Sequence, residues 1–592
     1  MTHLAVCLLP LVMISAAPTE NMSAMDARFA ELSNQWVQEF PEYGPVGATV
    51  LGDHRFDTSL DEVSPGARER SAMFCRKYLD QLKVIDRAQL SRTHQVDYAL
   101  LDHHLRGELW RLETLQEWAW NPLNYTDLAG SAIYGLMARE FAPLPNRLQS
   151  VTARLEQFPR LLHQVRETLD PKRVPPIHAE TAVKQNRGVL SIIEHLVQPQ
   201  IDKLPDSERN RLKKAIETAR GAVEEHQKWL EEVLVKNAQG DFRLGPKRFD
   251  EKLAFTLHTP MSRQEIRDRA ERELQRVRAE MYKVATDIYR KQYPFTAFPD
   301  SPTRDYQQAI IRAALELACR EAPSADKVVE TAVDSLKATT DFVREKDLIT
   351  LPDDPIAIIE MPEFQRGVST AYCDAPGPLD RGLKTFYAVA PLPADWTPEQ
   401  ITSFLREYNL RSIHNLTIHE AMPGHFVQLV ESNRFPSVLR AVLSSGTFVE
   451  GWACYTERMM LDEGYMDRDP LMTLVSLKWY LRAIGNSLLD QMIHVDGMRR
   501  EEAMRLMIEE TFQEEREAAG KWVRAQLTST QLSTYFVGVQ EHLDLRREVE
   551  ESKGKDFQLK AYHDAVISFG SPPVKFVRSL LLDQPIPMNA RE

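Results

Sequence analysis

The sequence predicts a mainly α-helical protein with a small β-sheet, and three observations lead to this fold class. Glycine is sparse, with 24 residues in a chain of 592. Long stretches place apolar residues at the 3.6-residue period of amphipathic helices. Only two stretches have the β-branched and aromatic composition of strands. Because 592 residues exceed what one compact core usually covers, we expect two lobes or one large helical body.

Amphipathic helices are predicted in both halves of the chain. Residues 144–169 and 206–237 are rich in Leu, Arg, Glu and Lys. Ser262 and Glu265 have the spacing of a capping box, and they begin a segment without glycine or proline up to about residue 290. These segments are expected to form the helical body.

A break in the helical pattern suggests how the chain is divided. Gly240 and Gly245 interrupt the periodicity after residue 237. We therefore predict an N-terminal helical lobe over residues 18–245 and a second helical lobe over 246–592. One continuous domain is the alternative.

Two short strands and a helix start are predicted in the second half. Residues 356–359 and 385–389 are apolar and bounded by prolines and glycines, as strands are. Thr397, Pro398 and Gln400 follow with the chemistry of a helix N-terminus, namely a capping threonine, proline at the first position and glutamine at the third. This helix is expected to run unbroken into the motif described below.

Charge and composition bear on partners and location. The formal charge is −13 and no basic block stands out, so a nucleic-acid partner is disfavoured. Residues 1–17 combine a short apolar run with small residues, as in a cleaved signal peptide; a frayed helix is the alternative. No stretch is long enough to form a transmembrane segment. We expect an exported protein, periplasmic or secreted, of undefined oligomeric state.

The segment HEAMPGH, from His419 to His425, indicates metal chemistry. Metallopeptidase helices often present two histidines four residues apart with a glutamate beside the first, here Glu420. Six residues on an unbroken helix would instead turn the two imidazoles apart by about 240°. Pro423 cannot donate a backbone hydrogen bond, and Gly424 tolerates unusual dihedral angles. We therefore predict a bulged turn that brings both rings to one metal; two ordinary helix histidines are the alternative.

A third ligand is predicted 25 residues after His425. Glu450 and Glu457 are seven residues apart, hence on one helix face, in an apolar setting where an unpaired carboxylate is costly. We assign Glu450 as a ligand and Glu457 as the acceptor that orients a histidine. Two histidines and one glutamate leave a position for water, as in catalytic Zn²⁺ sites. One Zn²⁺ ion, with Glu420 as general base, is the prediction; a salt-bridged glutamate pair is the alternative.

The runs HEAMPGHFVQ and EGWACYTE resemble the signature of the bacterial family called domain of unknown function 885. That family is similar to zincin metallopeptidases that use glutamate as third ligand. Weaker matches occur near Asn121 and Arg154 and in STYFVG at Ser533, KDFQLKAYHD at Lys555 and FGSPP at Phe569. The resemblance implies a helical body around a deep cleft, with a small sheet beside the metal. It does not identify a substrate.

The resemblance also implies roles for individual residues. The histidine, glutamate and histidine of the family motif, with the glutamate that opens EGWA, correspond to His419, Glu420, His425 and Glu450. The tyrosine of the S-x-Y-x-x-G segment is Tyr535, and the late histidine is His563, preceded by Tyr562 where phenylalanine is expected. Tyr535 or His563 is expected to donate to the negative oxygen of the tetrahedral intermediate. Ordinary packing is the alternative for both.

Two elements are candidates for substrate contacts. Arg546 could bind a substrate carboxylate by a bidentate contact, which would favour carboxypeptidase action; a solvated helix face is the alternative. The strand over 385–389, with Tyr387, could add an extended peptide to a sheet edge. We predict a zinc-dependent metallopeptidase that acts on oligopeptides or a small amide. The alternatives are a zinc hydrolase of a non-peptide amide or ester, an inactive binding protein on the same fold, and a helical scaffold without metal.

Overall fold

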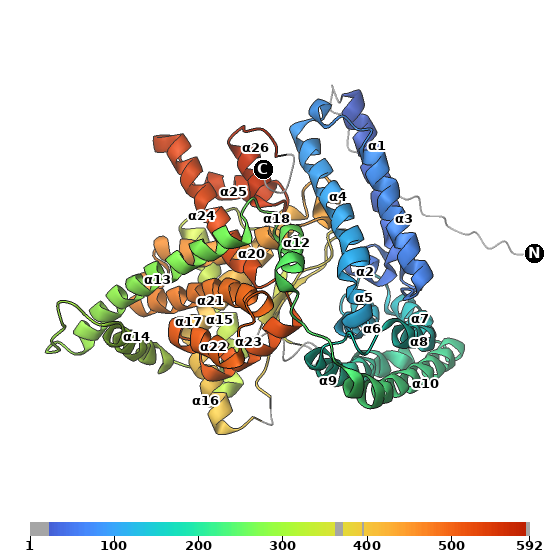
Figure 1. The fold of residues 1–592 in the computed structure, drawn as a ribbon, viewed down its shortest axis with the longest axis horizontal. Helices are drawn as coiled ribbons and strands as arrows, with labels where there is room; N and C mark the ends of the chain where they lie inside the picture. The colour runs from blue at the N-terminus through green and yellow to red at the C-terminus, as the bar shows by residue number, and fades with distance from the viewer. Residues whose placement is uncertain (1–22, 362–370, 394–395, 588–592) are drawn as a thin grey trace, which may run out of the picture.

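The computed structural model describes residues 23–361, 371–393 and 396–587, and within these ranges helices dominate (Figure 1). The N-terminal part contains α1 (Ala24–Glu39), α2 (Pro45–Val50), α3 (Pro65–Leu82), α4 (Arg92–Trp110), α5 (Glu117–Trp120), α6 (Leu123–Met137), α7 (Leu144–Leu155), α8 (Phe158–Thr168), α9 (Pro176–Ile192), α10 (Asp206–Trp229) and α11 (Val235–Asn237). The expected helix over 144–169 is therefore divided into α7 and α8.

The C-terminal part contains α12 (Gly245–Leu257), α13 (Arg263–Gln292), α14 (Arg304–Cys319), α15 (Val328–Glu345), α16 (Pro398–Glu407), α17 (Leu410–Glu420), α18 (His425–Ser432), α19 (Val438–Val442), α20 (Gly446–Asp462), α21 (Pro470–His494), α22 (Arg500–Arg505), α23 (Glu515–Leu527), α24 (Ser533–Lys553), α25 (Leu559–Ser568) and α26 (Val574–Leu581). The capping boxes predicted at Ser262 and Thr397 are both present. The mainly helical fold class is confirmed.

The helix that begins after Thr397 is shorter than predicted. It ends at Glu407, and a new helix, α17, begins at Leu410. The side chain of Asn409 accepts hydrogen bonds from the backbone N–H groups of Arg411 and Ser412, which caps the new helix. The prediction of one unbroken helix into the motif was therefore wrong.

A three-stranded sheet lies beside these helices, in the order β1-β3-β2. β1 (Ile356–Glu360) pairs in parallel with β3 (Thr385–Val389), and β2 (Ala371–Asp374) pairs antiparallel with β3. The sequence predicted β1 and β3 but missed β2. Because β3 is the central strand, it has no free edge, so the expectation that residues 385–389 add a peptide to a sheet edge was wrong.

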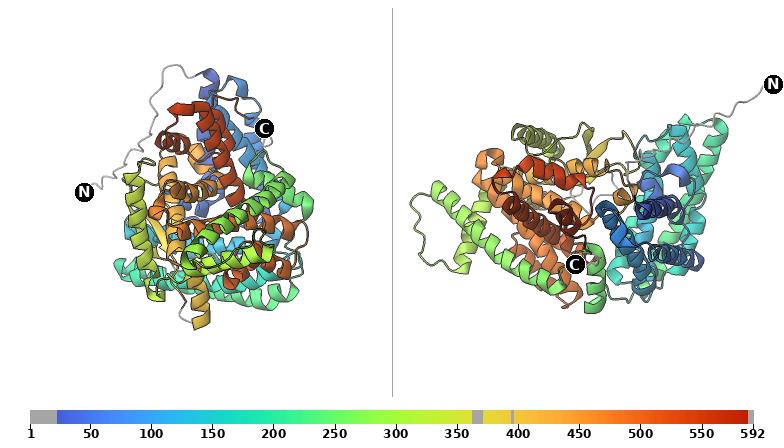
Figure 2. Two further views of the ribbon diagram at one scale, coloured as in Figure 1. Left: turned by 90° about the vertical axis from the view of Figure 1, so that its left-hand side faces the viewer. Right: turned by 90° about the horizontal axis from the view of Figure 1, so that it is seen from above.

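The helices up to α10 gather on one side of the molecule and those after α12 on the other (Figure 1 and the right view of Figure 2). The two sides are in contact through a buried ion pair, in which Nε of Arg440 lies 2.7 Å from Oδ1 of Asp97. The predicted boundary at residue 245 coincides with the start of α12. The division into two lobes stays a prediction.

One group of buried apolar side chains surrounds the region of the predicted metal site, among them Ile418, Phe426, Phe448, Trp452 and Tyr455. These residues belong to α17, α18 and α20, so the core of the C-terminal part holds the helices that carry the motif. Nowhere in the described residues is there a helix with both the length and the apolar character needed to cross a membrane.

Candidate metal centre

The helix break predicted at Pro423–Gly424 is present. α17 ends at Glu420 and α18 begins at His425. The backbone N–H of Gly424 donates to the carbonyl of Ile418 over 2.9 Å, six residues back, where an α-helix would span four. A Cβ at Gly424 would lie 1.9 Å from the carbonyl oxygen of His419, so only glycine fits this turn. As a result the two imidazole rings face the same space, with centroids 4.7 Å apart.

Glu450 on α20 faces both histidines. Its Oε2 lies 3.5 Å from Nε2 of His419 and 3.6 Å from Nε2 of His425. Among the described residues, this buried oxygen has no hydrogen-bond partner. Zinc bonds of about 2.0–2.1 Å at tetrahedral angles would separate two ligand atoms by about 3.3–3.4 Å. The three side chains therefore have the chemistry and the spacing to share one metal ion.

Glu457 contacts His419, the histidine that we expect it to orient. Its Oε1 accepts a hydrogen bond from Nδ1 of His419 over 2.7 Å, and its Oε2 accepts one from Asn415 over 2.6 Å. The bond fixes the proton of His419 on Nδ1 and leaves Nε2 free to face Glu450. Asn415 lies one helical turn before His419, so helical spacing was a signal that could have identified it.

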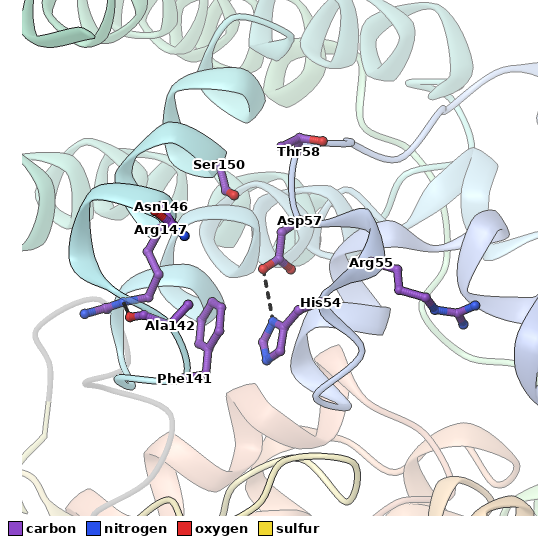
Figure 3. A pocket seen from close by; sticks show the side chains of 9 residues that line it. All are labelled: His54, Arg55, Asp57, Thr58, Phe141, Ala142, Asn146, Arg147 and Ser150. Carbon is purple, nitrogen blue, oxygen red and sulfur yellow. Dashed lines mark hydrogen bonds and ion pairs between the residues drawn. The ribbon is translucent and has the colours of Figure 1, made fainter. Parts of the chain in front are cut away.

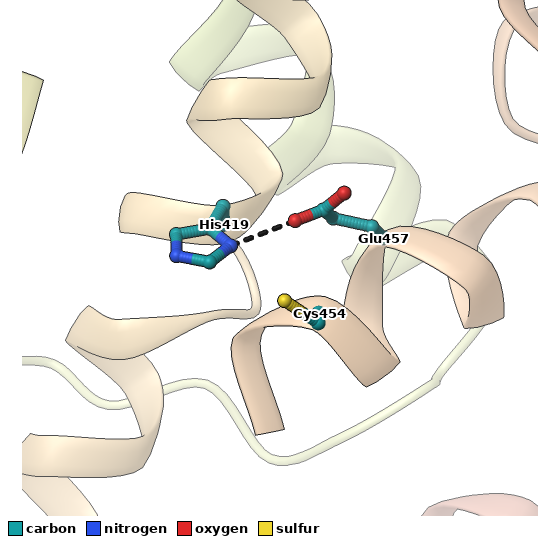
Figure 4. A group of neighbouring side chains, drawn as sticks. All are labelled: His419, Cys454 and Glu457. Atoms are coloured by element: carbon teal, nitrogen blue, oxygen red, sulfur yellow. Dashed lines mark hydrogen bonds and ion pairs between the residues drawn. The ribbon is translucent and has the colours of Figure 1, made fainter. Parts of the chain in front are cut away.

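A second possible ligand group shares His419 and consists of His419, Cys454 and Glu457 (Figure 4). Burial raises the pKa of the Cys454 thiol to about 12, so the thiolate that a metal requires is costly to form here. Both oxygens of Glu457 are already engaged in hydrogen bonds. The group with Glu450 is therefore the better site for an ion.

The electrostatic surroundings favour a positive charge at this position. Burial alone would lower the pKa of His419, but Cys454, Glu450 and Glu457 together raise it well above its usual value. Burial alone would raise the pKa of Glu450, but the two facing histidines lower it strongly. Both shifts come from attraction between the histidines and the carboxylates, so the carboxylates make positive charge favourable next to them.

Glu420 is held by a hydrogen bond from the neighbouring sheet. Its Oε2 accepts a hydrogen bond from the backbone N–H of Cys373 on β2 over 2.9 Å. Burial raises the pKa of Glu420, which makes its carboxylate more basic than usual. The strand that sequence reasoning missed therefore positions the predicted general base.

α24 crosses α20 at a pair of glycines, Gly538 and Gly451. A Cβ at Gly451 would lie 2.4 Å from the carbonyl carbon of Gly538, so the two backbones touch. Tyr535 lies about one turn before Gly538 on α24, and Glu450 precedes Gly451 on α20. Burial and then the charge of Glu450 raise the pKa of Tyr535, so its hydroxyl lies within electrostatic reach of Glu450.

The surroundings of His563 differ from those expected of a catalytic donor. The ring is completely buried, with Nδ1 2.7 Å from the carbonyl oxygen of Leu348 and Nε2 2.7 Å from the hydroxyl of Tyr455. Burial lowers the pKa of His563 to about 4, so the ring is neutral at pH 7 and donates its one proton to Leu348. This arrangement favours a role in holding Tyr455, and with it α20.

The two residues predicted to contact substrate, Arg546 and Tyr387, contact other side chains of the protein instead. Nη1 of Arg546 is 3.5 Å from the hydroxyl of Tyr455, and Nε is 3.9 Å from Glu550. Tyr387 is completely buried on β3, with its hydroxyl 3.3 Å from that of Thr417. A completely buried side chain cannot contact substrate, so Tyr387 supports α17 instead.

The deep cleft implied by the family resemblance stays a prediction. A cavity of about 290 Å³ lies in the N-terminal part instead, lined by His54, Arg55, Asp57, Thr58, Phe141, Ala142, Asn146, Arg147 and Ser150 (Figure 3). Within it, His54 forms an ion pair of 3.0 Å with Asp57.

Comparisons with known proteins agree with this fold. A family model described as "bacterial protein of unknown function (DUF885)" matches residues 45–581. A "putative lipoprotein of unknown function" from Shewanella oneidensis has 35% sequence identity and a TM-score of 0.79, covering 94% of this chain and 99% of its own. A "putative lipoprotein" from Colwellia psychrerythraea, at 16% identity, shows the same fold with a TM-score of 0.76 over 94% and 99% of the two chains. The search of curated proteins found no match.

Proposed function

The chain belongs to the bacterial DUF885 family, and we propose that it is a zinc-dependent hydrolase that cleaves peptide bonds. One observation carries the proposal. The Oε2 atom of Glu450 faces Nε2 of both His419 and His425 at 3.5 and 3.6 Å, with no hydrogen-bond partner among the described residues. A buried carboxylate in this position without a cation would be costly.

His419, His425 and Glu450 would hold the ion. A Zn²⁺ ion bound there supplies Lewis acidity, which lowers the pKa of a water molecule and polarises a carbonyl group. Glu420 is not a ligand, and its raised pKa suits it to take a proton from the attacking water and pass it to the leaving amine. Its hydrogen bond from Cys373 holds the carboxylate in one orientation.

Tyr535 is the residue that we assign to the negative oxygen of the intermediate. Its hydroxyl lies within electrostatic reach of Glu450 and accepts a hydrogen bond from Arg524 over 3.2 Å. A hydroxyl that accepts from a guanidinium keeps its own proton free to donate. His563 is a weaker candidate because its proton already binds Leu348.

The proposed ligand set would be that of zincin metallopeptidases, in which a glutamate adjoins the first histidine and a distant glutamate completes the ligand set. We also propose that the protein is exported. The apolar start of the sequence supports this, although residues 1–17 lie outside the described part. The solved relative from Shewanella oneidensis, described as a "putative lipoprotein", supports it too.

Metal content and activity test the proposal together. Elemental analysis of the purified chain is expected to give one zinc ion per molecule, and Glu450→Gln is expected to lose it. Glu420→Gln should retain zinc and lose peptide cleavage, because it removes only the base. Glu431→Gln is the matched control, since this side chain lies on α18, is 37% exposed and pairs with Arg434.

Two outcomes would contradict the proposal. A chain that binds no divalent metal would remove the ion from the account. A zinc-bound chain that cleaves an ester or a non-peptide amide, but no peptide, would keep the metal centre and refute the peptidase assignment.

A further inference from the structure

Arg524 on α23 is a half-buried cation without an acidic partner. One of its nitrogens, Nη2, donates to Oε1 of Gln531 over 3.1 Å and to the hydroxyl of Tyr535 over 3.2 Å. Both acceptors are neutral. Among the described residues no carboxylate lies within ion-pair distance of Arg524, and Nε and Nη1 have no hydrogen-bond partner although they reach solvent. These two nitrogens are therefore open to water or to a ligand.

The neighbours of Arg524 add to its positive charge. Arg482 and Lys521 lie close to it, and these two share Glu517, at 2.6 and 3.7 Å. Burial and then the charges of Arg482 and other neighbours, including Arg524, lower the pKa of Lys521 to about 7. Burial is the largest cause, and Glu517 and Glu407 oppose the shift, so the shift shows only that Arg482 and Arg524 lie close enough to act on Lys521.

Arg524 is also next to the candidate metal centre. It contacts Tyr535, the residue that we assign to the negative oxygen, and the charge of Glu450 acts on the guanidinium. Nε and Nη1 are therefore free donors on a side chain whose Nη2 atom contacts Tyr535. A guanidinium with two free donors matches a carboxylate, which it can bind bidentately.

We propose that Arg524 binds a carboxylate of the substrate and thereby selects peptides with a negative charge next to the cleaved bond. This inference rests on the proposed function, because it takes the space beside Glu450 and Tyr535 as the substrate site. The carboxylate is either the C-terminal group of the peptide or an acidic side chain. Arg546, the arginine that the sequence suggested for this role, instead contacts Tyr455 and lies near Glu550.

Binding is tested separately from turnover. The zinc-loaded Glu420→Gln protein is titrated by calorimetry with three N-blocked peptides of equal length. One has a free C-terminal carboxylate, one is amidated and neutral, and one is amidated with glutamate as its last residue. We expect at least one carboxylate peptide to bind ten times or more tightly than the neutral peptide. Adding Arg524→Gln should remove this preference, because it removes a charge-assisted bidentate contact.

Turnover gives the second readout. In the otherwise native protein, Arg524→Gln should lower kcat/KM for the preferred carboxylate peptide by about 100-fold, mainly through KM, and Arg524→Lys should lose less. Cleavage of the neutral peptide should fall by a clearly smaller factor, because only the hydrogen bond to Tyr535 is lost there, and an unchanged Tm shows that the variant is folded. Arg547→Gln is the control, because Arg547 is 64% exposed and pairs with Asp544.

The outcomes separate this inference from the proposed function. Equal binding of charged and neutral peptides would overturn the role of Arg524, even if peptides are cleaved. A loss of preference in Arg546→Gln, with Arg524→Gln unchanged, would overturn it as well. Selective carboxylate binding that depends on Arg524, in a protein that cleaves no peptide, would support the inference and refute the peptidase function.

Discussion

Substituting Gly424 by alanine tests whether the broken helix creates the metal centre. The added Cβ would lie 1.9 Å from the carbonyl oxygen of His419, and ordinary van der Waals contact begins at 3.4 Å. The turn must therefore open by about 1.5 Å, the difference between these distances. Functional geometry tolerates about 0.5 Å, so Gly424→Ala should move the two imidazoles out of register. We expect zinc affinity to fall at least 100-fold, which corresponds to about 2.7 kcal/mol.

The assay is competition for zinc with a chromophoric chelator, accompanied by thermal unfolding of the metal-free protein. Gly446→Ala is the matched control, because a Cβ there meets nothing within 4 Å and the residue begins α20, the helix of Glu450. Because Gly446 is the first residue of α20, this control should leave the stability unchanged or raise it by less than about 1 kcal/mol. If Gly424→Ala binds zinc as tightly as the native protein does, the turn does not set the positions of the ligands.

Three further predictions concern the metal site and the junction of the two parts. Glu457→Gln should weaken zinc binding by about 10–100-fold, because it removes the charged acceptor that orients His419; unchanged affinity in a zinc titration would refute that role. Cys454→Ala should leave zinc affinity within about threefold, whereas a large loss would show that the ion uses the group in Figure 4. Burial alone would lower the pKa of His54, but Asp380 and Asp57 raise it to about 9 from a usual 6.5. The contribution of protonated His54 to stability is therefore full below about pH 6.5 and is lost as pH rises through about 9. Over this range Tm should drop less in His54→Gln than in the native protein. An equal drop in both proteins would exclude His54 as its cause.

Local signals in the sequence predicted much of the fold. The capping boxes at Ser262 and Thr397 depend on residues three apart, so they can be found without knowledge of the tertiary structure. β2 was missed because Ala371–Asp374 is only four residues long and becomes a strand by pairing with β3. The break before α17 depends on a single side chain, Asn409, which caps the new helix inside a stretch that is otherwise periodic.

Some residues of the candidate site could be predicted from local sequence signals, and others could not. The ligands on α17 and α18 follow from one motif, and Glu450 and Glu457 from their helical spacing. Arg524 is 74 residues from Glu450, and its lack of an acidic partner is a property of the folded chain alone. For His563 the family resemblance identified the residue but could not show what its ring nitrogens contact. In the structure they contact Tyr455 and Leu348.

The contact between Gly451 and Gly538 has a mechanical consequence. With no side chain between the two backbones, there is no soft layer to absorb a displacement, and any movement of α24 pushes α20 directly. Glu450, a candidate ligand, and Tyr535 lie on these two helices close to the contact, so the contact holds their spacing. Any opening or closing around a substrate would have to come from helices and loops other than α20 and α24. Changes of length in the segments that join α20 to α24 would leave the spacing between Glu450 and Tyr535 unchanged.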